Sequence, residues 1–326
     1  MYRQEQEWNR NGIPLSRQTM SNWLLKCTED HLVPVYNRLH ASLIDHEILH
    51  ADETTLQVLH EEGKPAQSKS YMWLYRTSGD ALRPIVLYDY QPDRKAERPK
   101  AFLQGFRGYL HTDGYPGYHK LTDAITVIGC WAHARRKFDE ALKGLPEKAQ
   151  AGSLAQRAKQ YCDRLFELER GFADLSVQER YLKRQELSKP IIDDFFCWLR
   201  AKNTSTKSSF GSAAQYALGQ QKYLMRYLAD GRLEISNNRA ERSIKPFVIG
   251  RKNFLFANTA RGARASAMMY SLIETAKENA LNPYDYLVSV FMSAPDLDLK
   301  RNPELVDSLL PFPSSVQSCS AEATAV

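Results

Sequence analysis

Residues 48–58, ILHADETTLQV, open the part of the chain whose pattern decides the fold. β-Branched, aromatic and apolar residues dominate this run and two later ones, Tyr71 to Tyr75 and Pro84 to Tyr90, and the turn-prone segments EEGKP and TSGD separate the three. Runs of this kind are typical of strands joined by turns. The pattern therefore predicts a three-stranded antiparallel meander that begins at residue 48.

The order of elements beyond the meander indicates the fold class. We expect a basic helical stretch from Asp93 to Phe106, short strands at Tyr109 to Thr112 and Ala124 to Gly129, and a helix from Trp131 to Leu142. Three adjacent strands followed by alternating helix and strand is the order of a ribonuclease-H-like sheet. We therefore expect an α/β fold with a ribonuclease-H-like mixed sheet.

The remainder of the chain divides by composition and periodicity. Apolar residues between 145 and 232 recur at helical spacing, and the Ser/Thr-rich run KNTSTKSSFGS interrupts them, which predicts an all-helical insertion in two parts. A strand at Phe254 to Ala257 and helices at Ala263 to Ala280 and Tyr284 to Met292 are expected to follow. The predicted divisions are N-terminal helices at 1–44, a first core part at 45–144, the insertion at 145–232, a second core part at 233–294 and a disordered tail at 295–326.

The N-terminal residues show one clear helix signal. Ser16 is placed to cap a helix in which Met20, Trp23 and Leu24 share a face, while the opposite face is polar. That polar face is either a recognition helix of a helix-turn-helix or an ordinary solvated surface.

Composition excludes several classes of protein. The 326 residues carry a net charge of +6, which permits a polyanionic partner without requiring one. The chain has neither a signal peptide nor an apolar run of the roughly 18 residues that a membrane span needs. Its five cysteines are scattered and never form a CxxC pair, which argues against a zinc ribbon or a disulfide framework and favours a reducing, cytoplasmic setting. They are Cys27, Cys130, Cys162, Cys197 and Cys319.

Three acidic residues are the candidates for chemistry: Asp52 in HADETT, Asp113 in HTDGYPGY and Glu241 in SNNRAERS. A few carboxylates that share two divalent cations about 4 Å apart suit phosphodiester chemistry, and Mg²⁺ prefers such oxygen ligands. Each acid also has a plainer interpretation. Asp52 can accept backbone N–H bonds at a strand end, Asp113 can belong to an Asp-Gly turn, and Glu241 can face water on a charged helix.

Two clusters of basic residues are candidates for binding phosphates. The first surrounds Glu241 and the second is Arg135, Arg136 and Lys137. Cys130 and His133 precede the second cluster, so a thiol nucleophile is an alternative, although a cysteine that closes an apolar strand is more often simply buried. The first cluster comprises Arg239, Arg242, Lys245, Arg251 and Lys252.

Several long motifs together resemble one known family. ADETT, HTDGYPGY, GCWAHARRKF, SNNRAERSIKPFVIGRKNFLF and LIETAKENALNPYDYL, in this order, closely resemble the transposases of the insertion-sequence sixty-six type, from about Ile13 to Met292. The resemblance implies a DDE-type catalytic core on a ribonuclease-H-like fold, with Asp52, Asp113 and Glu241 as the catalytic and metal-binding triad.

The resemblance also implies cofactors and partners. Two Mg²⁺ ions are expected, for which Mn²⁺ can substitute, together with DNA as element ends and as target. A homodimer or higher oligomer is expected in the DNA complex, with accessory proteins of the element as further partners, no membrane, and a nucleoid-associated location in the bacterial cytoplasm. Asn237 and Asn238 are expected to orient Glu241 or contact DNA, or else to cap its helix.

Three other functions stay open at this point. A nuclease of the same fold would cut DNA without joining it, and a truncated, catalytically silent DNA-binding protein would regulate transposition. A structural protein with incidental acids is the third. Members of the family usually carry a longer, partly cysteine-rich N-terminal region, and we expect this chain to begin inside that region.

Overall fold

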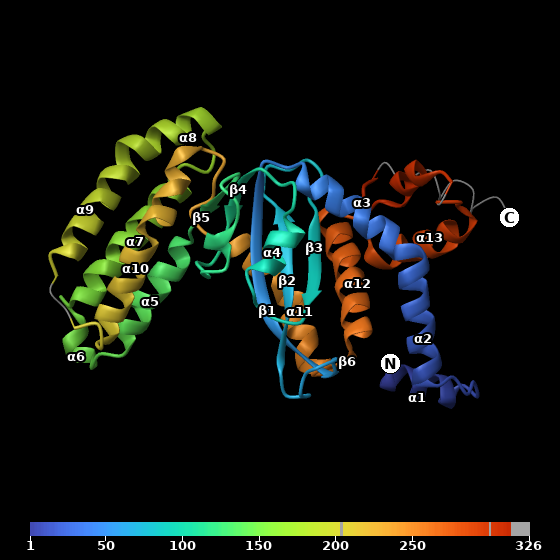
Figure 1. The fold of residues 1–326 in the computed structure, drawn as a ribbon. Helices are drawn as coiled ribbons and strands as arrows, with labels where there is room; N and C mark the ends of the chain where they lie inside the picture. Colours follow the sequence, from blue (N-terminus) through green and yellow to red (C-terminus); the bar gives the residue numbers. More distant parts are fainter. Residues whose placement is uncertain (203–204, 300, 314–326) are drawn as a thin grey trace. The chain divides into compact units, whose positions relative to one another are not determined.

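The computed structural model describes residues 1–202, 205–299 and 301–313 (Figure 1). Two compact units divide the chain, and each is made of segments distant in sequence. Unit 1 comprises Met1–His46, Asp52–Gly105 and Arg242–Val326, and unit 2 comprises Glu47–Ala51 and Phe106–Glu241. Two of the boundaries fall inside regular elements, one within the first strand after Ala51 and one within a long helix after Glu241.

A mixed sheet confirms the expected α/β class. Its strands follow the order β3-β2-β1-β4-β5, and β6 also pairs with β1. β4 is parallel to both β1 and β5, whereas β2 and β3 are antiparallel. The strands are β1 (Ile48–His60), β2 (Lys69–Thr77), β3 (Val86–Gln91), β4 (Gly108–His111), β5 (Ile125–Ile128) and β6 (Ala257–Thr259).

In unit 1, helix α12 covers the edge strand β3. The hydroxyl groups of Ser271 and Thr275 accept hydrogen bonds from the backbone N–H groups of Tyr88 and Val86, at 2.8 and 3.0 Å. These bonds occupy backbone groups that an edge strand otherwise leaves open to another chain. The helices of unit 1 are α1 (Tyr2–Arg10), α2 (Arg17–Cys27), α3 (Val33–Ile44), α4 (Glu97–Phe102), α12 (Ala260–Glu278) and α13 (Pro283–Ser293), together with most of α11 (Asn238–Phe254).

Local capping signals mark the helix starts in unit 1. The Ser16 hydroxyl accepts the backbone N–H of Thr19 and caps α2, as the sequence predicts. Asn282 caps α13 through the N–H of Tyr284. Capping satisfies donors that the first turn of a helix leaves without partners.

Two expectations for unit 1 were wrong. The predicted strand at Phe254 to Ala257 begins instead at Ala257, because α11 continues to Phe254 and ends at Leu255, whose φ of 64° is left-handed. The tail is not disordered throughout, because Pro303–Leu309 forms a 3₁₀ turn and buries Val306 and Leu309. The last part of the predicted tail, residues 314–326 with Cys319, lies outside the described residues.

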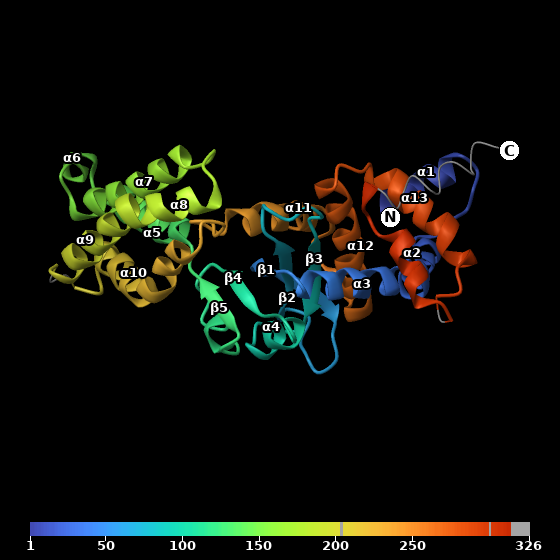
Figure 2. The same cartoon turned by 90° about the horizontal axis from the view of Figure 1, so that it is seen from above.

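Unit 2 contains a helical bundle that Figure 2 shows with α5, α7, α9 and α10 packed together. Large buried aromatic rings from α5 and α9 fill its centre, including Trp131, Phe138, Phe195 and Phe196. Among the described residues, every element from α5 to residue 229 is helical. The helices are α5 (Trp131–Lys143), α6 (Glu147–Gln150), α7 (Leu154–Gly171), α8 (Val177–Lys183), α9 (Lys189–Arg200) and α10 (Ser209–Met225).

No helix in the described parts of the chain combines the length and apolar character that crossing a bilayer requires.

Candidate active site

Two of the candidate acids occur in a repeated His-x-Asp pattern, one within strand β1 and one that begins at the last residue of β4. These parallel strands pair His50 with His111, and Asp52 and Asp113 each follow their histidine by two residues. The Asp52 Oδ1 accepts the N–H of Glu53 at 2.8 Å, and the Asp113 Oδ1 accepts the N–H of Tyr115 at 2.9 Å. Asp52 belongs to unit 1, whereas Asp113 belongs to unit 2.

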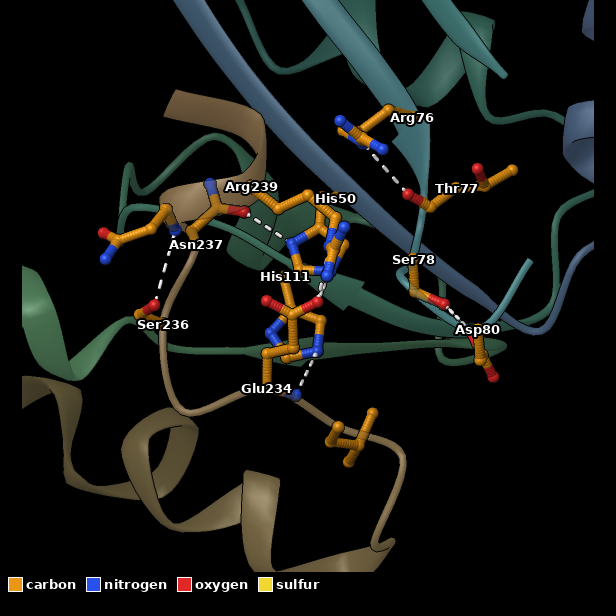
Figure 3. Close-up of polar contacts among 12 residues, drawn as sticks. His50, Arg76, Thr77, Ser78, Asp80, His111, Glu234, Ser236, Asn237 and Arg239 are labelled. Atoms are coloured by element: carbon orange, nitrogen blue, oxygen red, sulfur yellow. Dashed lines mark hydrogen bonds and ion pairs between the residues drawn. The ribbon is translucent and has the colours of Figure 1, made fainter. Parts of the chain in front are cut away.

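The paired histidines lie in a polar cluster of unit 2, which we call the histidine network: His50, His111, Glu234, Asn237 and Arg239 (Figure 3). The two imidazole rings are fully buried and stack, with centroids 4.3 Å apart and planes 10° apart. The Glu234 N–H donates to His111 Nε2 at 3.4 Å. Burial holds the pKa of His111 well below its usual range, with a smaller contribution from His50. His111 is therefore neutral, with its proton on Nδ1.

Asn237 connects the histidine network to the helix that carries Glu241. Its Oδ1 bonds with His50 Nδ1 at 3.0 Å, and its Nδ2 donates to the Ala51 carbonyl at 2.8 Å. Its own carbonyl accepts the N–H of Glu241 at 3.2 Å in the first turn of α11. Asn237 is fully buried. This burial argues against the expected DNA contact, and the bonds of Asn237 favour the alternative that it orients the Glu241 helix.

Glu241 lies beside two residues at the start of α5. Its Oε1 is 3.5 Å from His133 Nδ1, and its Oε2 accepts from Arg136 Nη2 at 3.1 Å. Burial lowers the pKa of His133, whereas the charges of Glu241 and Asp113 raise it. Asp113 is thus near enough to act on the same imidazole as Glu241. Unit 2 brings these two candidate acids into one electrostatic neighbourhood.

Cys130 closes the set of side chains around Glu241. Ligand atoms of Cys130, His133 and Glu241 all lie within 4.8 Å of one another. Burial raises the pKa of the Cys130 thiol to about 11, so the thiol is protonated near neutral pH. A protonated, buried thiol is a poor nucleophile, which disfavours the alternative of cysteine catalysis.

Two members of the second basic cluster, Arg135 and Arg136, line a polar cavity of unit 2. Its volume is about 610 Å³, and Arg135, Arg136 and Arg170 are among the lining residues, with Asn238. Arg135 pairs with Asp163 across the cavity wall. Lys137 lies over the Tyr216 ring, 4.7 Å from its centroid. Arg136 keeps half of its side chain exposed beside Glu241, which makes it the best-placed of the three cations for a phosphate near that acid.

The basic residues on and beside α11 have different environments. Arg239, in unit 2, pairs with Glu234 at 2.6 Å inside the histidine network. In unit 1, Arg251 donates to the Thr54 hydroxyl at 3.1 Å and also to the Thr55 carbonyl. The remaining three predicted DNA contacts are exposed to solvent: Arg242, Lys245 and Lys252.

Sequence reasoning missed Arg184, the residue that fixes the segment ahead of Asn237. Its guanidinium is buried, pairs with Glu169 at 2.6 Å and donates to three backbone carbonyls between residues 227 and 233. No pattern in its neighbourhood distinguishes it from a solvated helix arginine. The histidines did have a signal, because His-x-Asp occurs once inside a strand-like run and once where another such run ends.

Comparison with known proteins gives a consistent result. Residues 1–265 match the family model described as "Transposase IS66 family", and residues 271–312 match "IS66 C-terminal element". The uncharacterized protein y4hP of Sinorhizobium fredii is 32% identical over 323 residues, covering 93% of this chain and 58% of that protein. The uncharacterized protein y4qI of the same organism is 34% identical over 309 residues, covering 88% of this chain and 55% of that protein.

The chain thus spans somewhat more than half the length of these curated relatives. The two family matches together cover most of its length and include all the motifs around Asp52, Asp113 and Glu241. This chain belongs to the IS66 family of transposases.

Proposed function

We propose that this chain carries the catalytic core of a transposase that cleaves DNA at the ends of an insertion sequence and joins the freed strands to target DNA. Family membership supports the reaction class. The observation that carries the assignment of residues is the repeated His-x-Asp pattern, because strand pairing aligns His50 with His111 and each candidate aspartate follows by two residues. Glu241 is the third catalytic acid in this proposal.

We further propose that the sheet is ribonuclease-H-like. Support comes from the parallel β1, β4 and β5, the antiparallel β2 and β3, and the helical segment between Asp113 and Glu241. The proposed divisions of the chain are those expected from the sequence: N-terminal helices, a core in two parts, and an insertion at 145–232.

The proposed cofactor is Mg²⁺, or Mn²⁺ in its place, held by Asp52, Asp113 and Glu241. The donor set suits a hard cation, since all three residues offer carboxylate oxygens. Glu241 Oε1 is buried and makes no hydrogen bond to any described residue, which is unusual for a buried oxygen and consistent with a cation ligand. Two such ions would activate a water and stabilise the leaving oxygen of a phosphodiester.

The chain's own residues would prepare this site. Asn237 fixes the first turn of α11, and with it the direction from which Glu241 approaches. Arg136 lowers the cost of holding a carboxylate there and can move to a DNA phosphate, since its side chain is half exposed. Exposed basic residues on α11 would bind the phosphate backbone of DNA, so DNA binding should weaken steeply as the salt concentration rises.

A strand-transfer assay tests this proposal. The substrate is labelled DNA carrying the ends of the element, with Mg²⁺ and a supercoiled target plasmid. Asp113→Ala should abolish cleavage and joining, whereas Asp123→Ala, at an exposed position before β5, should leave both unchanged. Cleavage without joined products would favour a nuclease. Metal-dependent cleavage no greater than that of Asp113→Ala would refute the enzymatic assignment and leave a DNA-binding regulator.

Joining two ends to one target needs at least two protomers, so we also propose that the DNA complex contains a homodimer or a larger assembly. We also propose accessory proteins of the element as partners, and this proposal rests on family membership.

A further inference from the structure

The side chains around Glu241 include two donors that a magnesium site does not use. Cys130 ends the segment after β5 and precedes the first turn of α5, and His133 lies one turn later on the same helix. Glu241 comes from the first turn of α11. One ligand atom from each of the three residues lies within 4.8 Å of the other two.

Two of these atoms lack the partners that buried polar atoms normally have. His133 Nδ1 and Glu241 Oε1 are buried, and neither forms a hydrogen bond within the described part of the chain. They face each other at 3.5 Å, which is longer than a hydrogen bond. A cation between them would satisfy both atoms.

The third donor is suited to a softer cation. Cys130 Sγ accepts the backbone N–H of Asn237 at 3.2 Å, and it stands at the N-terminus of α5. Burial keeps this thiol protonated in the metal-free chain, whereas the backbone donors and the helix N-terminus favour the thiolate that a bound cation would require. Thiolate and imidazole ligands select Zn²⁺ and similar transition metals over Mg²⁺. Three protein ligands with further positions open to water is a common arrangement for such ions.

Nearby charges act in both directions. Arg136 pairs with Glu241 Oε2, and Lys137 also lowers the proton affinity of His133, so both cations oppose a metal ion. The negative charge of Asp113 has the opposite effect and raises the pKa of His133. Half of the Arg136 side chain is exposed, and its guanidinium can turn to solvent without leaving a buried charge behind.

We propose that Cys130, His133 and Glu241 form a binding site for one thiophilic divalent cation, such as Zn²⁺ or Co²⁺. On binding, the S–H bond of Cys130 breaks, the sulfur electron pair binds the cation, and the proton passes to solvent. The site shares Glu241 with the proposed magnesium site. A bound Zn²⁺ would therefore inhibit Mg²⁺-dependent cleavage, and this consequence alone rests on the proposed function.

The test is a titration of the metal-free, full-length chain with Co²⁺, followed by the near-ultraviolet absorption of the thiolate–cobalt bond. The unmodified protein should give a band that saturates at one Co²⁺ per chain and that Zn²⁺ displaces. Cys130→Ser should lose the band, and His133→Ala should weaken binding roughly tenfold or more. Cys162→Ser is the matched control, because Cys162 is also buried in unit 2 and lies outside the cluster.

Three results would overturn the proposal: no band in the unmodified protein, an undiminished band in Cys130→Ser, or an equal loss in Cys162→Ser. Circular dichroism of each variant verifies folding, and His133→Ala supplies an independent result if Cys130→Ser does not fold. A normal cobalt band in a protein that never cleaves DNA would contradict only the proposed function. Mg²⁺-dependent cleavage without the band would contradict only the thiophilic site.

Discussion

Replacing Asn237 with alanine tests whether the histidine network holds the start of α11. The substitution removes the bond between Asn237 Oδ1 and His50 Nδ1 and the bond from Nδ2 to the Ala51 carbonyl, both at a fully buried position. Leaving a buried polar group without its partner costs about 1–3 kcal/mol. With two bonds lost, we expect the free energy of unfolding of unit 2 to fall by about 2–4 kcal/mol.

The assay is thermal unfolding followed by circular dichroism. For a domain of about 150 residues, each kcal/mol corresponds to a Tm change of about 2–4 °C, so Asn237→Ala should lower Tm by about 5–15 °C. Asn238→Ala is the matched control. Asn238 is the next residue and is partly exposed, and the hydrogen bond that it donates to Ser236 comes from its backbone N–H. Its substitution should change stability by less than about 0.5 kcal/mol.

A second variant separates loss of hydrogen bonds from loss of volume. Asn237→Asp keeps the shape of the side chain but replaces the Nδ2 donor with an oxygen that faces the Ala51 carbonyl. It should therefore destabilise the protein at least as much as alanine does. The reasoning would be refuted if Asn237→Ala shifted Tm by less than about 2 °C, or if Asn238→Ala shifted it equally.

Two further predictions concern buried charges. Arg184→Ala should lower the free energy of unfolding by about 3–5 kcal/mol, because it leaves Glu169 without its ion-pair partner. Lys183→Ala, at an exposed ion pair, should lower it by less than about 0.5 kcal/mol, and equal losses of Tm in the two variants would contradict this reasoning. Burial raises the pKa of Asp89 to about 6, so the folded state binds its proton more tightly and the contribution of Asp89 to stability falls as pH rises from about 4 to 6. The stability of Asp89→Asn relative to the unmodified protein should therefore rise by about 1–3 kcal/mol when the pH is raised from 4 to 7.5. Thermal melts at the two pH values measure this change, and a stability difference that does not depend on pH would count against it.

Local patterns predicted the elements whose causes are local. The β-branched run at 48–58 is a strand, Ser16 caps a helix, and Asn282 begins another. Helix ends were harder. The run at 254–257 contains two phenylalanines and a leucine, which favour a strand in isolation. In the structure α11 continues through Pro246 as far as Phe254, and β6 begins only where residues 257–259 pair with β1.

The environment of the candidate site depended on contacts distant in sequence. The sequence contains both His-x-Asp segments, but only strand register shows that their histidines are opposite one another and stack. The sequence did not indicate that Asn237 is buried, because asparagine is usually exposed. It is buried because His50 and Ala51, far earlier in the chain, supply its partners. Local periodicity contains no information about such partners.

The helical segment between Asp113 and Glu241 has a structural consequence for the third acid. Arg184 donates hydrogen bonds to the carbonyls of Tyr227, Asp230 and Leu233. These bonds hold the segment that directly precedes Glu234. From Glu234 the bonds continue into the histidine network and then, through Asn237, to the first turn of α11. All of these contacts lie within unit 2. Because hydrogen bonds and one stacked ring pair connect these residues in series, we expect the fold of the helical segment to be coupled to the position of Glu241, so that a substitution at Arg184 should disturb Glu241 from a distance.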